Sequence, residues 1–350
     1  SMFVVGLIEG AAEATALIVK VFSGALSDYW GKRKPLAVLG YGLGAFSKPL
    51  FAMATSSGWI ITARLLDRVG KGIRGAPRDA LVADIAPPEV RGAAFGLRQS
   101  LDTVGAFLGP TLAVVFMLLW NDNFRAVFWV ATVPAFMCVA LLVWGVKEPD
   151  RPITTKRSNP ISRANLARLS PAYWWVVSVG AVFTLARFSE AFLVLRASEG
   201  GLALAWTPLV LIGMNIVYSS CAYPFGKLAD KVRHTWLLGW GLLLLIGADS
   251  LLAYSNSGVV FWAGVALWGL HMAMTQGLLA AMVADTAPTD LRGTGYGFFN
   301  LLSGVAMLIA SGLAGWLWQR WGATFTFAAG IGFAALALLL LVLQPRGLAR

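Results

Sequence analysis

Long apolar segments dominate this sequence and limit what it can fold into. Of its 350 residues, 58% are hydrophobic and only 13% are charged, which is more apolar surface than a soluble domain of this length can bury. A helix needs about 20 apolar residues to cross a bilayer. Eleven segments meet this requirement: 2–26, 36–55, 58–77, 95–118, 124–145, 173–195, 207–226, 236–255, 259–283, 297–318 and 324–343. The sequence therefore predicts an all-α membrane protein with eleven spans.

Lysine and arginine are unequally distributed between the loops that join these segments. Alternate loops carry sixteen of them on one side and only Arg125, Arg196 and Arg320 on the other. Because cytoplasmic loops collect positive charge, we expect a multi-pass protein of a prokaryotic inner membrane with its C-terminus in the cytoplasm. The same asymmetry accounts for the net charge of +11, so no nucleic-acid partner is expected.

Two parts of the sequence are similar to each other at an offset of 201 residues. "ALVADIAPPEVRGAAFG" (80–96) and "AMVADTAPTDLRGTGYG" (281–297) share nine of seventeen residues, and "GALSD" (24–28) resembles "GKLAD" (226–230). Such a repeat indicates two halves in the same orientation. We predict an N-terminal bundle over 1–146, a cytoplasmic linker over 147–172 and a C-terminal bundle over 173–350.

The repeat also indicates how many spans each half should have. The segment at 173–195 would have its partner 201 residues earlier, at positions before Ser1. We therefore expect a protein of twelve helices, of which this chain holds helices two to twelve, with five spans in the first half and six in the second.

At this point the residues resemble the major facilitator superfamily over nearly the whole chain. "GALSDYWGKRK" (24–34) matches the family's loop motif between helices two and three, and "GKLADKVRH" (226–234) stands where the family has its second copy. Arg64 resembles the arginine of the fourth-helix motif. "GAFLGP" (105–110) resembles the fifth-helix motif of proton-driven exporters.

The resemblance implies a fold and a function. The fold consists of two six-helix bundles that are parallel repeats, with the substrate bound between them near the middle of the membrane. The function implied is proton-coupled secondary transport of small organic solutes by alternating access, with export favoured over import. The partners are then a small-molecule solute, protons and the lipid bilayer, and we expect a monomer without a cofactor.

The loop motifs supply candidate gating residues. Asp28 can accept hydrogen bonds from the N-terminus of a neighbouring helix, and Lys32 and Arg33 can pair with an acid such as Asp84. Asp230 is the corresponding acid of the second copy. These contacts would break when the cytoplasmic gate opens; alternatively, the basic residues serve only to orient the protein.

The segment "DRVGKGIRGAPRD" (67–79) contains a GxGxxG pattern at Gly70, Gly72 and Gly75. A dinucleotide site requires a strand before these glycines, whereas an apolar helix precedes them here. The pattern is therefore interpreted as small residues that allow close helix packing.

The charged residues of the same helix fall on one face at 100° per residue. A lipid-facing arginine is costly, so this stripe must face protein or water. It can attract an anionic substrate, for which Arg64, Arg68 and Lys71 are the candidates, or carboxylates of neighbouring helices can neutralise it for structure and gating. Arg74, Arg78 and Asp79 lie closer to the cytoplasmic end and favour the second interpretation.

Further polar residues lie inside the spans. Glu13, Asp102 and Glu190 are candidates for proton coupling, although Asp102 with Arg98, and Glu190 with Arg187, can equally form structural ion pairs. His271 and Gln276 are candidate substrate-binding residues. His271 can also be a packing residue or a second proton carrier, because histidine ordinarily titrates near neutral pH.

Other function classes find little support in the sequence. There is no GxSxG, HExxH or P-loop pattern, and two histidines and two cysteines stand in unrelated places, so neither an enzyme nor a metal site is expected. Two alternatives to export remain: a proton symporter that imports an anionic nutrient or metal-chelate, and a transporter that is inactive without its first helix.

Overall fold

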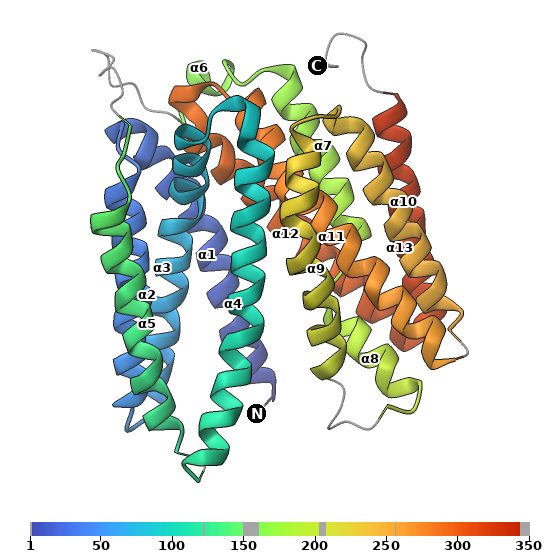
Figure 1. Cartoon of the computed structure of the whole chain (residues 1–350), viewed down its shortest axis with the longest axis horizontal. Helices are drawn as coiled ribbons and strands as arrows, with labels where there is room; N and C mark the ends of the chain where they lie inside the picture. Colours follow the sequence, from blue (N-terminus) through green and yellow to red (C-terminus); the bar gives the residue numbers. More distant parts are fainter. Residues whose placement is uncertain (1, 122, 150–160, 203–207, 256, 344–350) are drawn as a thin grey trace. The chain divides into compact units, whose positions relative to one another are not determined.

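The computed structural model describes the backbone of residues 2–121, 123–149, 161–202, 208–255 and 257–343. Side chains are described in the same ranges except for 2–15, 114 and 208. Helices account for the regular structure of these ranges (Figure 1). They are α1 (Met2–Trp30), α2 (Lys34–Ala52), α3 (Ser57–Ile85), η1 (Pro88–Val90), α4 (Arg91–Leu119), α5 (Phe124–Gly145), α6 (Arg163–Leu166), α7 (Pro171–Ala186), α8 (Ala191–Glu199), α9 (Pro208–Ala229), α10 (His234–Ala253), α11 (Gly258–Thr286), η3 (Thr289–Leu291), α12 (Arg292–Trp321) and α13 (Ala323–Val342).

The helices follow the predicted spans, with two differences. Within the described residues, eight helical stretches are long and apolar enough to cross a membrane, and they run from the start of η1 to the end of α13. Two other predicted segments form α2 and α3, which do not meet this criterion; the charged stripe of α3 lowers its mean hydropathy. The first predicted segment forms α1, much of which lies outside the residues to which the criterion applies. The second difference is that the predicted span 173–195 is not one helix but two, α7 and α8.

Proline sets the same boundary in both copies of the repeat. After α3, Pro87 and Pro88 lead into the short turn η1, and α4 begins at Arg91. After α11, Pro288 leads into η3, and α12 begins at Arg292. Proline lacks an amide hydrogen and disfavours helical geometry in the residue before it, so each copy ends one long helix and starts the next at an equivalent position.

The loop motif after α1 has a specific backbone conformation. Gly31 has φ = +67°, a value that favours glycine, and its N–H donates to the Asp28 carbonyl over 3.2 Å. Helix α2 then starts with Pro35 in its first turn. The Glu148 carboxylate accepts from the backbone N–H groups of Arg33 and Lys34, which satisfies donors that a helix N-terminus leaves open.

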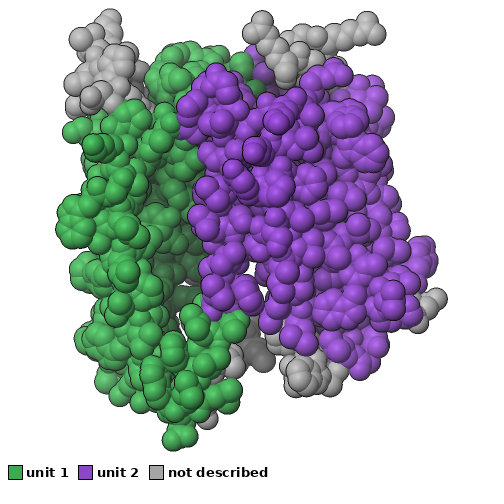
Figure 2. Space-filling view, in the orientation of Figure 1, with its two compact units in different colours: residues 1–85, 109–170, 286–301 green, residues 86–108, 171–285, 302–350 purple. Residues whose placement is uncertain are grey.

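The chain forms two compact units, coloured separately in Figure 2. Unit 1 comprises 1–85, 109–170 and 286–301, and unit 2 comprises 86–108, 171–285 and 302–350. Unit 1 thus includes the start of α12 from the second half of the sequence, and unit 2 includes the start of α4 from the first half. The division at 147–172 into two bundles stays a prediction.

Glycines bring the helices of unit 1 close together, with α3 packed against both α1 and α2. A Cβ atom on Gly70 would lie 2.7 Å from the Gly40 carbonyl oxygen of α2, and one on Gly72 would lie 2.8 Å from the Ala16 carbonyl oxygen of α1. The GxGxxG pattern therefore serves helix packing, as predicted from the sequence.

In unit 2, α13 packs against α7 and α10, and α8 packs against α9. Large buried side chains fill the space between these helices, among them Trp268, Phe183, Phe327 and Leu242. This apolar interior surrounds a small number of buried polar groups, including Asp249, His271 and Thr275.

Candidate functional site

Asp28, in the last turn of α1, binds the N-terminus of α12 within unit 1. Its Oδ1 accepts from the Gly293 N–H over 3.0 Å, and its Oδ2 accepts from the N–H and the hydroxyl of Thr294 over 2.5 and 2.6 Å. A carboxylate here satisfies open donors and interacts favourably with the helix dipole. This is the geometry that the loop motif predicts.

Arg33 lies beside Asp28 and is fully buried. Its Nη1 atom pairs with the Asp28 carboxylate and donates to the Ser27 hydroxyl over 2.6 Å. Its Nε atom lies 3.2 Å from Asp84 Oδ2 at the end of α3. One guanidinium therefore joins two acids that belong to different helices.

Asp84 forms an ion pair with a second arginine, Arg292, which belongs to the other half of the sequence. Arg292 Nη1 lies 2.9 Å from Asp84 Oδ1, and both side chains are less than 10% exposed. The five residues Asp28, Arg33, Asp84, Arg292 and Thr294 are called the Asp28 cluster below. Its two cations and two anions balance, as buried charges require.

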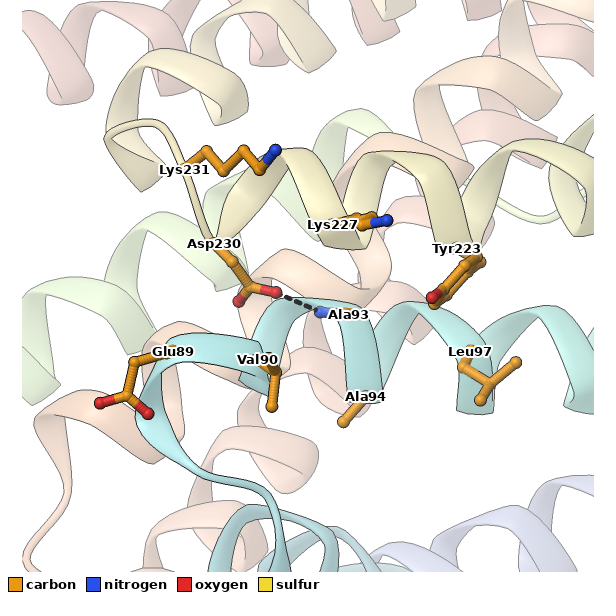
Figure 3. A pocket seen from close by; sticks show the side chains of 9 residues that line it. All are labelled: Glu89, Val90, Ala93, Ala94, Leu97, Tyr223, Lys227, Asp230 and Lys231. Carbon is orange, nitrogen blue, oxygen red and sulfur yellow. Dashed lines mark hydrogen bonds between the residues drawn. The ribbon is translucent and has the colours of Figure 1, made fainter.

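Unit 2 contains the related arrangement. Asp230, at the end of α9, accepts from the N–H groups of Gly92 and Ala93 at the start of α4, over 2.6 and 2.9 Å. Figure 3 shows the bond to Ala93. Arg91 Nη1 lies 2.7 Å from Asp285 Oδ1, and His234 Nδ1 lies 3.9 Å from Asp285 Oδ2. Asp230, Arg91, Asp285 and His234 are called the Asp230 cluster.

The repeat explains the likeness of the two clusters. Asp84 and Arg91 of the first copy correspond to Asp285 and Arg292 of the second, at the offset of 201 residues. The ion pairs cross over: Asp84 binds Arg292, and Arg91 binds Asp285. The alignment of the repeats identifies these arginines as equivalent, but sequence reasoning did not name them as site residues.

The two clusters differ in burial and in one basic residue. Side chains of the Asp28 cluster are 0 to 8% exposed in their ion pairs, whereas those of the Asp230 cluster are 11 to 37% exposed. The second cluster has His234 beside its acid where the first has Arg33. Water screens exposed pairs more strongly, so we expect the Asp28 cluster to have the stronger interactions.

Double-mutant cycles measure this difference directly. With alanine at each position, we expect a coupling energy of about 1–3 kcal/mol for Asp84 with Arg292 and about 0.2–1 kcal/mol for Arg91 with Asp285. Equilibrium unfolding of the single and double variants in mixed micelles gives both energies. Equal couplings would contradict the inferred difference in strength.

Part of the charged stripe of α3 faces α2. Asp67 accepts from Lys48 Nζ over 2.9 Å and from the Ser47 hydroxyl over 3.3 Å. The Arg74 guanidinium lies over the Tyr41 ring, 4.3 Å from its centre. These contacts fit the structural interpretation of the stripe for Asp67 and Arg74.

The candidate substrate-binding residues of α3 lie elsewhere on the helix. Arg64 and Arg68 are half-buried, with their Nε atoms shielded from solvent, and Lys71 is exposed. Their role in substrate binding stays a prediction. Glu13, a candidate proton carrier, lies in the part of α1 whose side chains are outside the described residues.

The other proton-coupling candidates have different surroundings. Asp102 pairs with Arg98 over 2.8 Å, four residues apart on α4, and its side chain is 47% exposed. The ion pair of Arg187 with Glu190, the alternative to proton coupling by Glu190, is not formed. Because α7 ends at Ala186 and α8 begins at Ala191, these two residues do not sit one turn apart on a continuous helix, and no ion pair joins them in the described structure.

His271 and Gln276, the candidates on α11, have local partners. His271 is fully buried, its Nδ1 atom lies 2.8 Å from the Gly241 carbonyl oxygen, and its ring stacks on Phe183 at 5.1 Å. With the Gln276 amide oriented so that its oxygen faces Arg187, this oxygen accepts from both Nη atoms of the guanidinium. Lys32 is exposed, and no hydrogen bond or ion pair from it is found among the described residues.

Comparisons with known proteins agree with this architecture. The chain is 33% identical over 345 residues to an uncharacterized MFS-type transporter of Methanocaldococcus jannaschii, covering 97% of this chain and 85% of the relative. It is 26% identical to the multidrug resistance protein MdtL of Citrobacter koseri, covering 95% of this chain and 80% of that one. The fold is similar to the crystal structure of the Escherichia coli fucose:proton symporter FucP, with a TM-score of 0.80 at 15% identity, over 99% of this chain and 91% of that one.

A family model gives the most extensive match. The model of the Major Facilitator Superfamily matches residues 1–303 and 198–350, which together span the whole chain. With the 33% identity to an MFS-type transporter, this match shows that the chain belongs to the major facilitator superfamily.

Proposed function

We propose that this transporter exports small organic solutes in exchange for protons, by alternating access. The observation that carries the proposal is the pair of repeat-related clusters, each of which binds the start of a helix from the other half of the sequence. Hydrogen bonds and ion pairs hold these helix starts, and water can replace such contacts when they separate. They are therefore suited to a gate that opens and closes in each cycle.

The clusters also suggest which side of the membrane this gate faces. Asp28 and Asp230 adjoin the loops at 31–33 and 230–234, which belong to the Lys- and Arg-rich side of the sequence. By the positive-inside rule, these loops are cytoplasmic. The arrangement with both clusters formed is then a state whose cytoplasmic gate is closed.

Two features support export. Residues 105–110 of α4 read "GAFLGP", which resembles the fifth-helix motif of proton-driven exporters. The second feature is the similarity to the multidrug resistance protein MdtL. The alternative of a proton symporter importing an anionic solute would use the same gate and the cations Arg64, Arg68 and Lys71.

The direction of proton movement tests the proposal. Full-length protein in proteoliposomes with a preset proton gradient is given organic anions and lipophilic cations in turn, while a dye reports lumenal pH. We expect protons and solute to move in opposite directions, and Glu13→Gln, Asp102→Asn or Glu190→Gln to reduce this coupling if that residue carries the proton. Movement in the same direction would indicate import, and solute transport that ignores the gradient would exclude proton coupling.

A further inference from the structure

A pocket lies between α4 and α9 within unit 2, next to the Asp230 cluster. Its volume is about 400 Å³, and Figure 3 shows that both helices line it. Most of the side chains that line it are exposed, so the pocket is a groove at the surface of unit 2. This volume is in the range of sites that bind small molecules.

The wall that α4 contributes is apolar. Val90, Ala94 and Leu97 line the pocket there, and Leu101, one turn beyond Leu97, is exposed as well. At 100° per residue, these four side chains fall within an arc of about 60° on one face of the helix. A lipid acyl chain is as apolar as leucine. This face of α4 therefore suits an acyl chain that enters the pocket from the membrane.

The wall that α9 contributes ends in two lysines. Lys227 lies in the last turn of α9 and Lys231 just beyond it; both are exposed and line the pocket. In the described part of the chain, neither ammonium group has a hydrogen bond or an ion pair. Ile216, Tyr223 and Lys227 lie within an arc of about 40° on one exposed face of α9. An apolar residue, a tyrosine and a lysine in this order match the change from acyl chains to head groups across a bilayer surface.

Two acids also line the pocket. The Asp230 carboxylate accepts from two N–H groups at the start of α4, and the helix dipole there offsets its charge. Glu89 is exposed, and its negative charge opposes an anion in the pocket. The two lysines still outnumber this one carboxylate. By the positive-inside rule, the lysines lie on the cytoplasmic side, where anionic lipids give the membrane surface a negative potential.

We propose that this pocket binds an anionic phospholipid. Its phosphate pairs with Lys227 and Lys231, and its acyl chain follows the apolar face of α4. A lipid that contacts both helices opposes their separation, so it favours the arrangement in which Asp230 binds the start of α4. The lipid site goes beyond the proposed function, since binding requires neither a gradient nor turnover. Only an influence of the lipid on the gate rests on that function.

Lipid binding to the purified full-length protein in detergent tests the site. The probes are phosphatidylglycerol, phosphatidylcholine with the same acyl chains, and glycerol 3-phosphate, which has the charged group but no chains. Native mass spectrometry reports how much of each lipid binds. We expect phosphatidylglycerol to bind at least about 10-fold more tightly than phosphatidylcholine, because each lysine attracts the net negative charge. Glycerol 3-phosphate should compete weakly, since it buries no apolar surface.

Variants of the charged residues test which groups hold the lipid. The double variant Lys227→Gln, Lys231→Gln should weaken phosphatidylglycerol binding at least about 10-fold and leave phosphatidylcholine binding unchanged. Glu89→Gln should strengthen phosphatidylglycerol binding a few-fold, because it removes the opposing charge. Phosphatidylglycerol should raise the melting temperature of the wild type but not that of the double lysine variant. Without lipid, this variant should melt as the wild type does, because both lysines are exposed and unpaired.

A second double variant is the matched control. Lys147→Gln, Arg163→Gln removes two exposed cations of the predicted cytoplasmic linker, outside the pocket, and should keep the preference for phosphatidylglycerol. Ala94→Phe tests the apolar wall, since a larger side chain fills the groove. It should weaken the binding of both lipids.

Four outcomes would overturn the site: equal binding of the two lipids by the wild type, an unchanged preference in the double lysine variant, an equal loss in the control variant, or wild-type lipid binding in Ala94→Phe. Displacement of phosphatidylglycerol by an equal concentration of glycerol 3-phosphate would indicate a site for a free phosphate ester and overturn the lipid. Lysine-dependent lipid binding by a protein that moves neither solute nor protons in proteoliposomes would support the site and count against the proposed function.

Discussion

Transport is expected to fall at least about 10-fold when Asp28 is replaced by alanine, because removing one partner of a buried ion pair costs about 3–5 kcal/mol. The substitution leaves Arg33 fully buried with Asp84 as its remaining acid, and it leaves the Gly293 and Thr294 donors at the start of α12 without their acceptor. The arrangement in which the Asp28 cluster is formed loses population, and a cycle that passes through this arrangement slows.

The measurement is the initial rate of solute-linked proton movement in proteoliposomes at matched protein density, together with the affinity for the transported solute in detergent. We expect the rate to fall and the affinity to change little, since the role proposed for Asp28 is in the gate. Asp230→Ala is the matched control from the second copy. It removes an acceptor from two N–H groups in the more exposed cluster, so its effect should be smaller. A wild-type rate in Asp28→Ala would refute the gating role.

Replacing Gly226 with alanine should lower the melting temperature by several degrees, since overpacking costs about 1–3 kcal/mol. A Cβ atom there would lie 2.9 Å from Gly96 Cα and 3.0 Å from the Gly92 carbonyl carbon, both backbone atoms of α4. Backbone cannot rotate away as a side chain can, so α9 and α4 must separate. The separation also draws Asp230 away from the N–H groups that it binds.

Gly332→Ala is the control for this experiment. Gly332 lies inside α13, and a Cβ atom there would meet nothing within 4 Å. Alanine stabilises a helix interior by about 1 kcal/mol relative to glycine, so the control should raise the melting temperature while Gly226→Ala lowers it. Thermal unfolding of both variants in detergent shows whether each substitution raises or lowers the melting temperature. A rise in both would show that α9 and α4 do not touch at Gly226.

The sequence predicts the helices well because span length and apolar composition are local properties. It also predicts the role of Asp28 as a helix-terminal acceptor, since the loop motif places an acid at the end of α1. The sequence does not predict which helix Asp28 binds, because Gly293 and Thr294 lie 265 and 266 residues away. No local pattern contains that information, and the repeat indicates only which residues are equivalent.

Two features of the structure could not be predicted from the sequence. The stretch at 187–190 has no proline or glycine, so apolar composition predicted a continuous helix, and the pairing of Arg187 with Glu190 followed from that error. Helical spacing predicted the charged stripe of α3, but it did not predict which residues of the stripe contact α2. Asp67 and Arg74 face Lys48 and Tyr41 of α2, and this depends on how two helices pack.

The crossed pairing of the repeats limits how the two halves of this protein can change over time. Asp84 is matched to Arg292, 208 positions further along the chain, and Arg91 to Asp285, 194 positions further. A substitution that removes a charge in one copy therefore leaves a residue of the other copy without its ion-pair partner. A second substitution that compensates for this loss must then occur in the other copy. Although the halves share a sequence pattern, they cannot diverge independently at these positions.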